Sequence, residues 1–302
     1  MTQHLTLPID GPFSLAAAAS FGFGPRTGTP LTDGGQMRLA FVTDDLQHQA
    51  GVTIGQLPAG DLTAELGDAA DPVGAERQIR RILSVDRPVT GWLAAGVQDP
   101  VLGRLQGEHP GLRPVLFHSP YEAAAWAVLS QRRQRTQATA LRQRLADHCG
   151  QAFGLAFGVE RAFPLPQRLL DLDGFPGIES QRMERLHAVA ARALAGDLDP
   201  ASLAAMETDE ALAHLRTIPG LGPFYAGLVL YRSSGVADAL PIGEPRLMAC
   251  MRHYYGLDHT PDDDEARRIA QAWRPFRTWG AALLRAAGDR SGLPELSAPA
   301  RN

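Results

Sequence analysis

The segment from Leu215 to Tyr255 constrains the fold of this chain more than any other stretch of its sequence. Two runs with helical periodicity flank the turn Ile218-Pro219-Gly220-Leu221-Gly222. Paired glycines permit a tight turn in which successive backbone N–H groups face outward at the start of the second helix. Such a turn can bind a phosphate, although a plain helical hairpin that uses glycine only as a cap gives the same pattern.

A loop after the second helix delivers a single carboxylate, Glu244, directly before Pro245. Proline favours the first helical position, so Glu244 is the predicted N-cap of the next helix, with its carboxylate directed toward the hairpin. Glu is a poorer cap than Asp or Ser, which marks it as a candidate functional residue. A surface acid paired with Arg246 is the alternative, and the local pattern alone does not decide between them.

The composition is that of an ordinary soluble globular protein, and a length of 302 residues suggests about two domains. No apolar run approaches the roughly 18 residues that a membrane span needs. The N-terminal residues lack the basic flank and apolar core of a secretory signal, so we expect a cytoplasmic protein. The net charge of −4 argues mildly against a nucleic-acid partner, although an average charge can hide a basic patch.

Two residue types are too scarce for certain chemistries. Cys149 and Cys250 are the only cysteines, which excludes a disulfide framework and a cluster held by four thiolates. All 29 basic residues are arginine, so no side-chain amine can form a Schiff base with a sugar or another carbonyl substrate.

Hydrophobic periodicity divides the chain into a mixed α/β part and a helical part. Residues 36–44 and 49–56 have strand patterns, and an amphipathic helix begins at Pro72. After a linker at 110–114 the chain is predicted to be nearly all helical. A helix begins near Pro120, and others are expected at 180–195, 200–205, 209–216, 223–234, 245–255 and 262–273. The tail after Gly288 is predicted to be disordered.

Three motifs occur in the order found in the helix-hairpin-helix DNA glycosylases. They are the hairpin, the Leu-Pro-x-Gly-acid loop at 240–244, and the later segment Trp273-Arg274-Pro275-Phe276-Arg277-Thr278. The chain most resembles the bacterial 3-methyladenine DNA glycosylase II family, which acts in alkylation repair. Residues 119–124, running into 129–131, match the start of that family's helical region, and the resemblance covers about residues 10–288.

The resemblance implies an α+β fold. A TATA-binding-protein-like α/β domain is expected at residues 1–88, followed by two all-helical domains. The first, at 112–232, contains the helix-hairpin-helix motif. The second, formed by 89–111 and 233–290, carries the acid, and 291–302 is the predicted disordered tail.

The activity that the resemblance implies is hydrolysis of the N-glycosidic bond of an alkylated purine that is flipped out of double-stranded DNA. Glu244 lies where the family carries its catalytic acid, which is normally Asp. That carboxylate would stabilise an oxocarbenium-like sugar and position the attacking water. Its extra methylene matters because catalysis is sensitive to displacements of about 1 Å.

The remaining site residues are assigned by their positions in the family pattern. Phosphate contacts are expected from the hairpin and the basic segment after residue 130, and a base-stack wedge from the turn before that segment. The base pocket is expected to be poor in aromatic rings, with Arg285 about where a stacking tryptophan stands in the best-known members. The phosphate residues are Gly220, Leu221, Gly222, Arg133 and Arg135; the wedge residues are Gln131 and Arg132; the pocket residues are Phe224, Leu228, Pro245 and Arg285.

The missing lysines predict a glycosylase without lyase activity, and the two cysteines exclude the iron–sulfur branch. No cofactor or side-chain metal site is expected. A structural Na⁺ or K⁺ at the hairpin would bind the carbonyls of about Arg216, Ile218 and Leu221. A monomer is expected. The alternatives are a weak or inactive paralogue that only binds DNA and, third, a glycosylase for oxidised bases.

Overall fold

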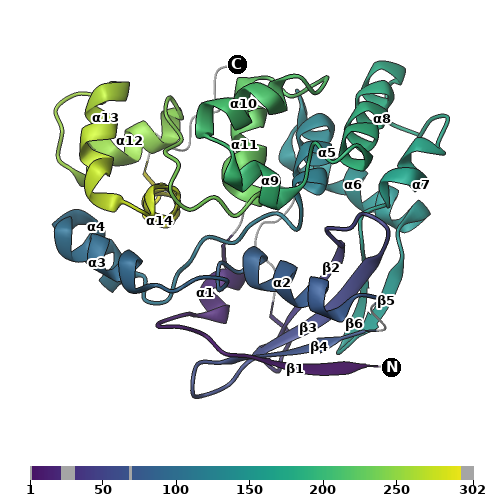
Figure 1. Ribbon diagram of the computed structural model, residues 1–302, viewed down its shortest axis with the longest axis horizontal. Helices are drawn as coiled ribbons and strands as arrows, with labels where there is room; N and C mark the ends of the chain where they lie inside the picture. The colour runs from purple at the N-terminus through teal and green to yellow at the C-terminus, as the bar shows by residue number, and fades with distance from the viewer. Residues whose placement is uncertain (1, 22–30, 68–69, 294–302) are drawn as a thin grey trace. The chain divides into compact units, whose positions relative to one another are not determined.

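The computed structural model describes residues 2–21, 31–67 and 70–293, which divide into two compact units (Figure 1). Unit 1 is drawn from residues 1–9, 19–86 and 115–235, and unit 2 from residues 10–18, 87–114 and 236–302. The mixture of helices with a small antiparallel sheet confirms the predicted α+β class. The three-domain division at the predicted boundaries stays a prediction.

Unit 1 contains a four-stranded antiparallel sheet with the strand order β1-β4-β3-β2. The predicted strands at 36–44 and 49–56 are β2 (Met37–Val42) and β3 (Gln49–Gln56), which pair with Met37 opposite Ile54. Strands β1 (Gln3–Leu7) and β4 (Leu62–Leu66), with only five residues each, were not predicted. Alternate residues of β4 are buried, as expected of a sheet with one face on the core.

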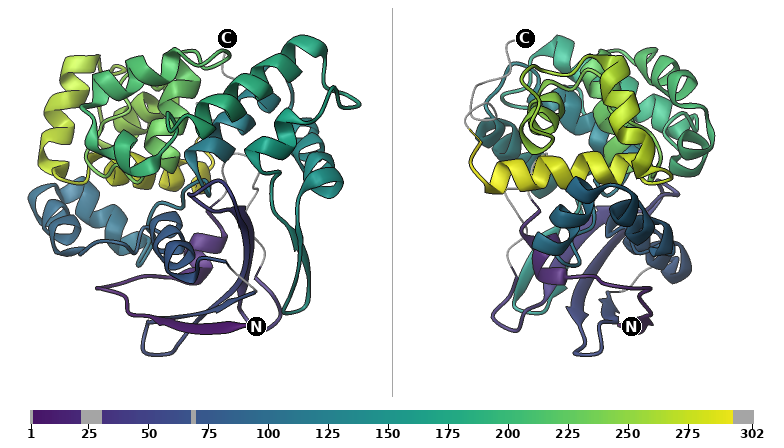
Figure 2. Two further views of the ribbon diagram at one scale, coloured as in Figure 1. Left: turned by 45° about the vertical axis from the view of Figure 1, so that its right-hand side comes forward. Right: turned by 90° about the vertical axis from the view of Figure 1, so that its left-hand side faces the viewer.

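A second hairpin interrupts the region that was predicted to be nearly all helical. Strands β5 (Ala152–Leu155) and β6 (Gly158–Arg161) pair with each other and run along the main sheet (Figure 2). Phe153 packs so closely on β3 that a Cβ at Gly51 would lie 2.5 Å from its ring. Arg38 of β2 forms an ion pair with Glu160 at 3.1 Å. These contacts with the sheet, distant in sequence, stabilise strands that their short local pattern does not reveal.

The first ten residues of α5 (Pro120–Ser130) are all buried within unit 1. Small residues, with alanine at 123–125, let neighbouring helices approach it closely. Ser119 caps its N-terminus by accepting a hydrogen bond from the Glu122 amide at 3.2 Å, where the helix was predicted to begin near Pro120. The other helices are α2 (Pro72–Ile82), α6 (Arg135–Cys149), α7 (Pro166–Leu170), α8 (Ser180–Leu194), α9 (Pro200–Ala205), α10 (Thr208–Arg216) and α11 (Pro223–Ser233).

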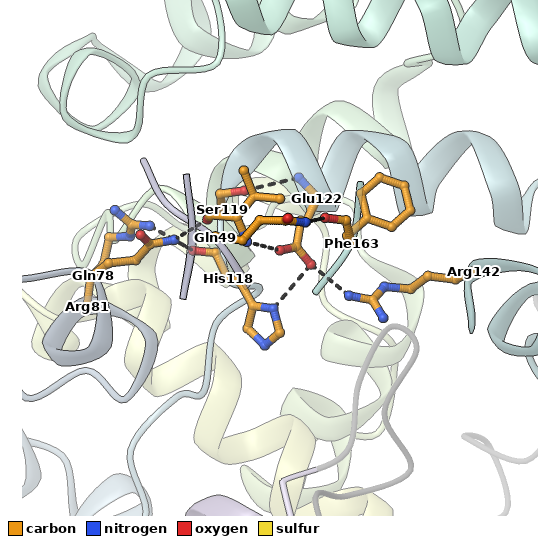
Figure 3. A network of polar contacts seen from close by, with 9 residues as sticks. Gln49, Gln78, Arg81, His118, Ser119, Glu122, Arg142 and Phe163 are labelled. Carbon is orange, nitrogen blue, oxygen red and sulfur yellow. Dashed lines mark hydrogen bonds and ion pairs between the residues drawn. The ribbon is translucent and has the colours of Figure 1, made fainter. Parts of the chain in front are cut away.

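A buried polar network joins the start of α5 to the sheet (Figure 3). The Glu122 carboxylate accepts a hydrogen bond from the Val42 amide at 3.1 Å. It also contacts His118 Nδ1 at 3.1 Å and accepts a bond from Arg142 Nη2 at 2.8 Å. Burial alone would raise the pKa of Glu122, but His118, Arg142 and the Val42 amide together lower it to about 2. The N-terminal end of α5 is therefore held by an ionised, fully buried carboxylate.

Unit 2 is helical, with α3 (Thr90–Gln98), α4 (Pro100–Glu108), α12 (Pro245–Tyr254), α13 (Asp263–Ile269) and α14 (Arg277–Arg290). Helix α1 (Leu15–Ala19) contains the point at which the chain passes from unit 2, at residue 18, to unit 1, at residue 19. At the core of unit 2, Asp99 accepts hydrogen bonds from Tyr255 Oη at 2.5 Å and Trp273 Nε1 at 2.9 Å. A buried carboxylate with two such donors fixes the packing of three elements that are far apart in sequence.

Two predicted boundaries in unit 2 were wrong. The predicted helix at 262–273 changes to a short 3-10 helix at Ala270–Trp273, where the Trp273 side chain turns into the core. Helix α14 continues through Arg290, past the predicted start of the disordered tail, because its last turn still packs through Ala287. Residues 294–302 of that tail lie outside the described residues. Within the described ranges, every helix is too short or too polar to cross a bilayer.

Candidate functional site

In unit 1, the turn between α10 and α11 presents free backbone donors. Gly220 has φ +96°, a conformation that a residue with a side chain rarely adopts, and the Leu221 amide donates to the Ile218 carbonyl at 3.0 Å. Gly222 is extended and precedes Pro223 as the N-cap of α11. Among the described residues, the amides of Gly220 and Gly222 have no acceptor. Their geometry, beside a helix N-terminus, suits an anion such as a phosphate.

The same turn includes the carbonyl groups that were predicted to hold a monovalent cation. They belong to Arg216, Ile218 and Leu221, and the Ile218 carbonyl also accepts the Leu221 amide of the turn. Neutral carbonyl oxygens can coordinate a hard cation without any charged side chain. Groups of three or more His, Cys, Asp or Glu residues that could hold a metal ion are absent from the described part of the chain.

The turn that follows α5 carries the predicted wedge. Arg132 is exposed and has φ +52°, an uncommon conformation for a residue other than glycine. Gln131 does not fit the predicted wedge role, because its amide donates to the Gly220 carbonyl at 2.5 Å and accepts from Arg185 at 2.9 Å. Of the two predicted wedge residues, only Arg132 has a side chain available to enter DNA.

The two arginines that were predicted to contact phosphates differ in their surroundings. Arg133 Nη2 donates to the Gly177 carbonyl and to the Glu179 carboxylate, each at 2.9 Å. Its guanidinium is therefore already used to hold the loop before α8. Arg135, at the start of α6, is exposed and has no ion pair among the described residues. Arg135 is the better candidate for a phosphate contact.

Phe224, in the first turn of α11, is an exposed aromatic residue beside the hairpin. The residue is 63% exposed, which is unusual for a large apolar residue. Its ring meets Tyr225 edge-on, with the centroids 5.2 Å apart. Leu228, one turn further along, is half-buried. An exposed ring beside free backbone donors is a suitable surface for stacking against a nucleic-acid base.

In unit 2, Glu244 is the N-cap of α12, as predicted from the following proline. One carboxylate oxygen accepts a hydrogen bond from the Leu247 amide at 2.7 Å, and the other from the Arg246 amide at 3.3 Å. Both donors lie in the first turn, where the helix dipole also favours negative charge. Each oxygen keeps a further lone pair for a water molecule or a sugar. The predicted alternative, a surface acid paired with the Arg246 side chain, is therefore not needed to explain Glu244.

Arg285 of α14 lies beside this carboxylate. Its Nε is 3.8 Å from Glu244 Oε2, and its Nη2 is 3.7 Å from the carboxylate of Asp289. Its Nη1 is buried and has no hydrogen-bond partner among the described residues. Burial raises the pKa of the nearby Cys250 thiol to about 12, so this cysteine stays neutral. Pro245 is exposed at the start of the helix.

Two residues that connect the parts of the unit 1 site were missed by the sequence analysis. Arg182 and Arg185 of α8 bind Gln131 through its carbonyl and its side-chain amide respectively. Their spacing of three residues places them on one helix face, but many exposed arginine pairs share that spacing. Only the packing of α8 on α5 shows which groups they contact.

Curated relatives with similar sequences are described as DNA repair or DNA glycosidase-like proteins, although no family model matches the chain. A Mycobacterium tuberculosis protein described as "probable bifunctional transcriptional activator/DNA repair enzyme AlkA" is 28% identical over 293 residues, which cover 94% of this chain and 56% of that protein. The chain thus spans little more than half of that relative's length. The alkylbase DNA glycosidase-like protein mag2 of Schizosaccharomyces pombe is 23% identical and is matched over 57% of this chain and 80% of its own length.

Solved structures with the same fold cover almost the whole chain. A 3-methyladenine DNA-glycosylase from Archaeoglobus fulgidus superposes with a TM-score of 0.76 at 18% identity, over 96% of this chain and 99% of its own. An 8-oxoguanine glycosylase/lyase from Clostridium acetobutylicum, in complex with double-stranded DNA, gives a TM-score of 0.68 at 14% identity, over 97% and 99%. At these identities the likeness establishes the fold.

Proposed function

We infer that this chain belongs to the helix-hairpin-helix DNA glycosylase superfamily, in its alkylation-repair branch, and that it hydrolyses the N-glycosidic bond of flipped-out alkylated purines in double-stranded DNA. The observation that carries this proposal is the position of Glu244. Its carboxylate is fixed by two first-turn amides, yet its side chain is still 26% exposed. A fixed, accessible negative charge is what a reaction through an oxocarbenium-like sugar requires.

In the proposed reaction, the bond between the sugar and the base breaks first, and the base leaves with the bonding electrons. Alkylation at a ring nitrogen makes the purine cationic, so it departs as a neutral molecule without a general acid. The Glu244 carboxylate stabilises the developing positive charge on the sugar. It then accepts a proton from the water whose oxygen bonds to the anomeric carbon. The amides of Arg246 and Leu247 keep the carboxylate in place between these steps.

The hairpin and the turn after α5 supply the DNA contacts in this proposal. The amides of Gly220 and Gly222 bind a backbone phosphate, and Arg135 adds a salt-sensitive contact. Arg132 fills the gap left by the flipped nucleotide and stacks its guanidinium against the neighbouring base pair. Phe224 and Leu228 offer the flipped base an apolar surface beside the hairpin.

Two finer properties follow from residue types rather than geometry. A lyase step needs an amine that attacks the sugar, and the chain has no lysine, so we propose a monofunctional glycosylase. The carbonyls of Arg216, Ile218 and Leu221 would hold a Na⁺ or K⁺ ion that stiffens the hairpin. We propose no other cofactor, and a monomer bound to duplex DNA.

The test is release of methylated purines from alkylated duplex DNA by the wild-type protein and by Glu244→Gln. The wild type should release 3-methyladenine and 7-methylguanine, whereas Glu244→Gln should lose about 100-fold or more while it still binds DNA. Equal release by both proteins would remove Glu244 from the mechanism. Salt-sensitive DNA binding without release by the wild type would instead favour a DNA-binding paralogue that does not cleave.

A further inference from the structure

Helix α5 is a rigid support whose C-terminal end leads into the turn of Arg132. The helix is buried along its length, and Glu122 anchors its first turn to the sheet. After Ser130 the chain turns back, and the Arg133 amide donates to the Ser130 carbonyl at 3.2 Å. Arg132 stands exposed in this turn with a positive φ. Such an uncommon conformation persists only where the surroundings impose it.

Arg182 of α8 supplies one part of those surroundings. Its Nη1 donates to the last carbonyl groups of α5, those of Val128 at 2.6 Å and Leu129 at 3.3 Å, and to the Gln131 carbonyl at 3.1 Å. These carbonyls have no partner inside the helix, so the guanidinium takes the role of a C-cap. Glu179 holds Arg182 in place by accepting from its Nε at 3.1 Å.

The side chain of Gln131 joins this turn to the hairpin. Its Nε2 donates to the Gly220 carbonyl at 2.5 Å, and its Oε1 accepts from Arg185 Nη1 at 2.9 Å. Arg185 also packs against the hairpin, since a Cβ at Gly220 would lie 3.2 Å from its Cδ. The amide is therefore held at both ends, and its orientation is set by Arg185.

We propose that Gln131 and Arg185 are positioning residues that lock the phosphate-binding hairpin to the wedge turn. Gln131 directly precedes Arg132, and its side-chain amide is bound to the Gly220 carbonyl. The phosphate-binding hairpin and Arg132 therefore keep a constant spacing. Capture of a phosphate by the hairpin then places Arg132 at the base stack, so binding and unstacking are coupled. Without this lock the hairpin still binds DNA, but Arg132 no longer arrives at a defined position.

This inference rests on the proposed function, because it assumes that both elements contact one duplex. Its readout, however, needs no catalysis. A duplex that contains a stable abasic-site analogue beside 2-aminopurine reports unstacking by fluorescence, and an end-labelled undamaged duplex reports binding by anisotropy. If the wild type unstacks the probe but releases no methylated base, the proposed chemistry fails and the lock is still measured.

The main variant is Gln131→Glu, which is close in shape and can still accept from Arg185, but cannot donate to the Gly220 carbonyl. Its matched control is Gln181→Glu, the same charge change at an exposed residue of α8. We expect Gln131→Glu to reduce the unstacking amplitude and the single-turnover excision rate roughly tenfold, as expected when a partly buried acceptor loses its donor. Its affinity for undamaged DNA should match that of the control within about twofold.

A second pair tests the other end of the amide. Arg185→Met should reproduce the loss of unstacking, whereas Arg185→Lys can still donate to Gln131 and should retain most of it. Arg132→Ala should abolish unstacking, alone or combined with the other substitutions, and so give the baseline fluorescence of the assay. The proposal would be overturned if Gln131→Glu unstacked the probe as well as Gln181→Glu does. It would also be overturned if Gln131→Glu lost DNA binding and thermal stability in parallel with unstacking, because Gln131 would then have only a general structural role.

Discussion

The ion pair between Arg285 and Glu244 predicts that this arginine restrains catalysis. Arg285 Nε lies 3.8 Å from the Glu244 carboxylate, which must stabilise a positively charged sugar in the proposed reaction. A cation at that distance offsets part of the negative potential that the reaction uses. Replacing Arg285 with glutamine leaves a shorter polar side chain that carries no charge. We therefore expect Arg285→Gln to release methylated purines faster than the wild type.

The size of the effect follows from the distance and the exposure. Two unit charges 3.8 Å apart interact by about 4 kcal/mol at an effective dielectric constant of about 20. The side chains are 20% and 26% exposed, and Asp289 shares the arginine's charge, so we reduce this value to about 1–2 kcal/mol. That range corresponds to a roughly tenfold increase in the rate of the chemical step. Selectivity should fall in return, because a stronger field also assists poorer leaving groups.

The measurement is single-turnover release of 7-methylguanine from duplex DNA, with release of unmodified guanine followed in parallel. Arg268→Gln, the same charge change at an exposed residue of α13, controls for general effects on DNA affinity. Thermal stability should change little, because the loss of the ion pairs with Glu244 and Asp289 is offset by removal of Arg285 Nη1, a buried donor without a partner in the described residues. A slower or unchanged rate for Arg285→Gln would refute the reasoning and make Arg285 a positioning residue for the carboxylate.

Three further predictions concern stability and DNA contacts. The pKa of Glu122 is lowered from 4.5 to about 2 in the folded state. Above pH 4.5 this carboxylate should therefore contribute about 3 kcal/mol to the free energy of unfolding, and this contribution is lost as the pH falls toward 2. Urea unfolding from pH 7 to 3 should therefore show a smaller acid-dependent loss in Glu122→Gln, and an unchanged pH dependence would contradict this. Glu244→Ala should cost about 1 kcal/mol of unfolding free energy through loss of the cap, whereas Glu244→Asp should cost little, and chemical denaturation of the two compares them. Arg135→Ala should reduce the magnitude of the slope of log affinity against log salt by about one. Arg133 differs because its guanidinium is bound to Glu179, so a similar change in Arg133→Ala would show that this ion pair opens on DNA.

Local sequence signals predicted the elements that carry the site. Proline after Glu244 predicted a cap, and the structure shows its carboxylate on the first-turn amides of α12. The helices around the hairpin begin and end within one residue of their expected positions, at Thr208–Arg216 and Pro223–Ser233. These signals succeed because caps, glycine turns and amphipathic periods are properties of neighbouring residues. The short strands β5 and β6 were not predicted, because their stability comes from contacts with the sheet and not from neighbouring residues.

The sequence by itself therefore determined the α+β class, the hairpin and the capped carboxylate. Tertiary structure alone decided which partner each polar side chain takes. It placed the Gln131 side chain on the Gly220 carbonyl, and it set Arg285 beside Glu244. The physical reason is that a long polar side chain can reach several partners at similar energy. Only the packing of helices that are far apart in sequence selects one of them.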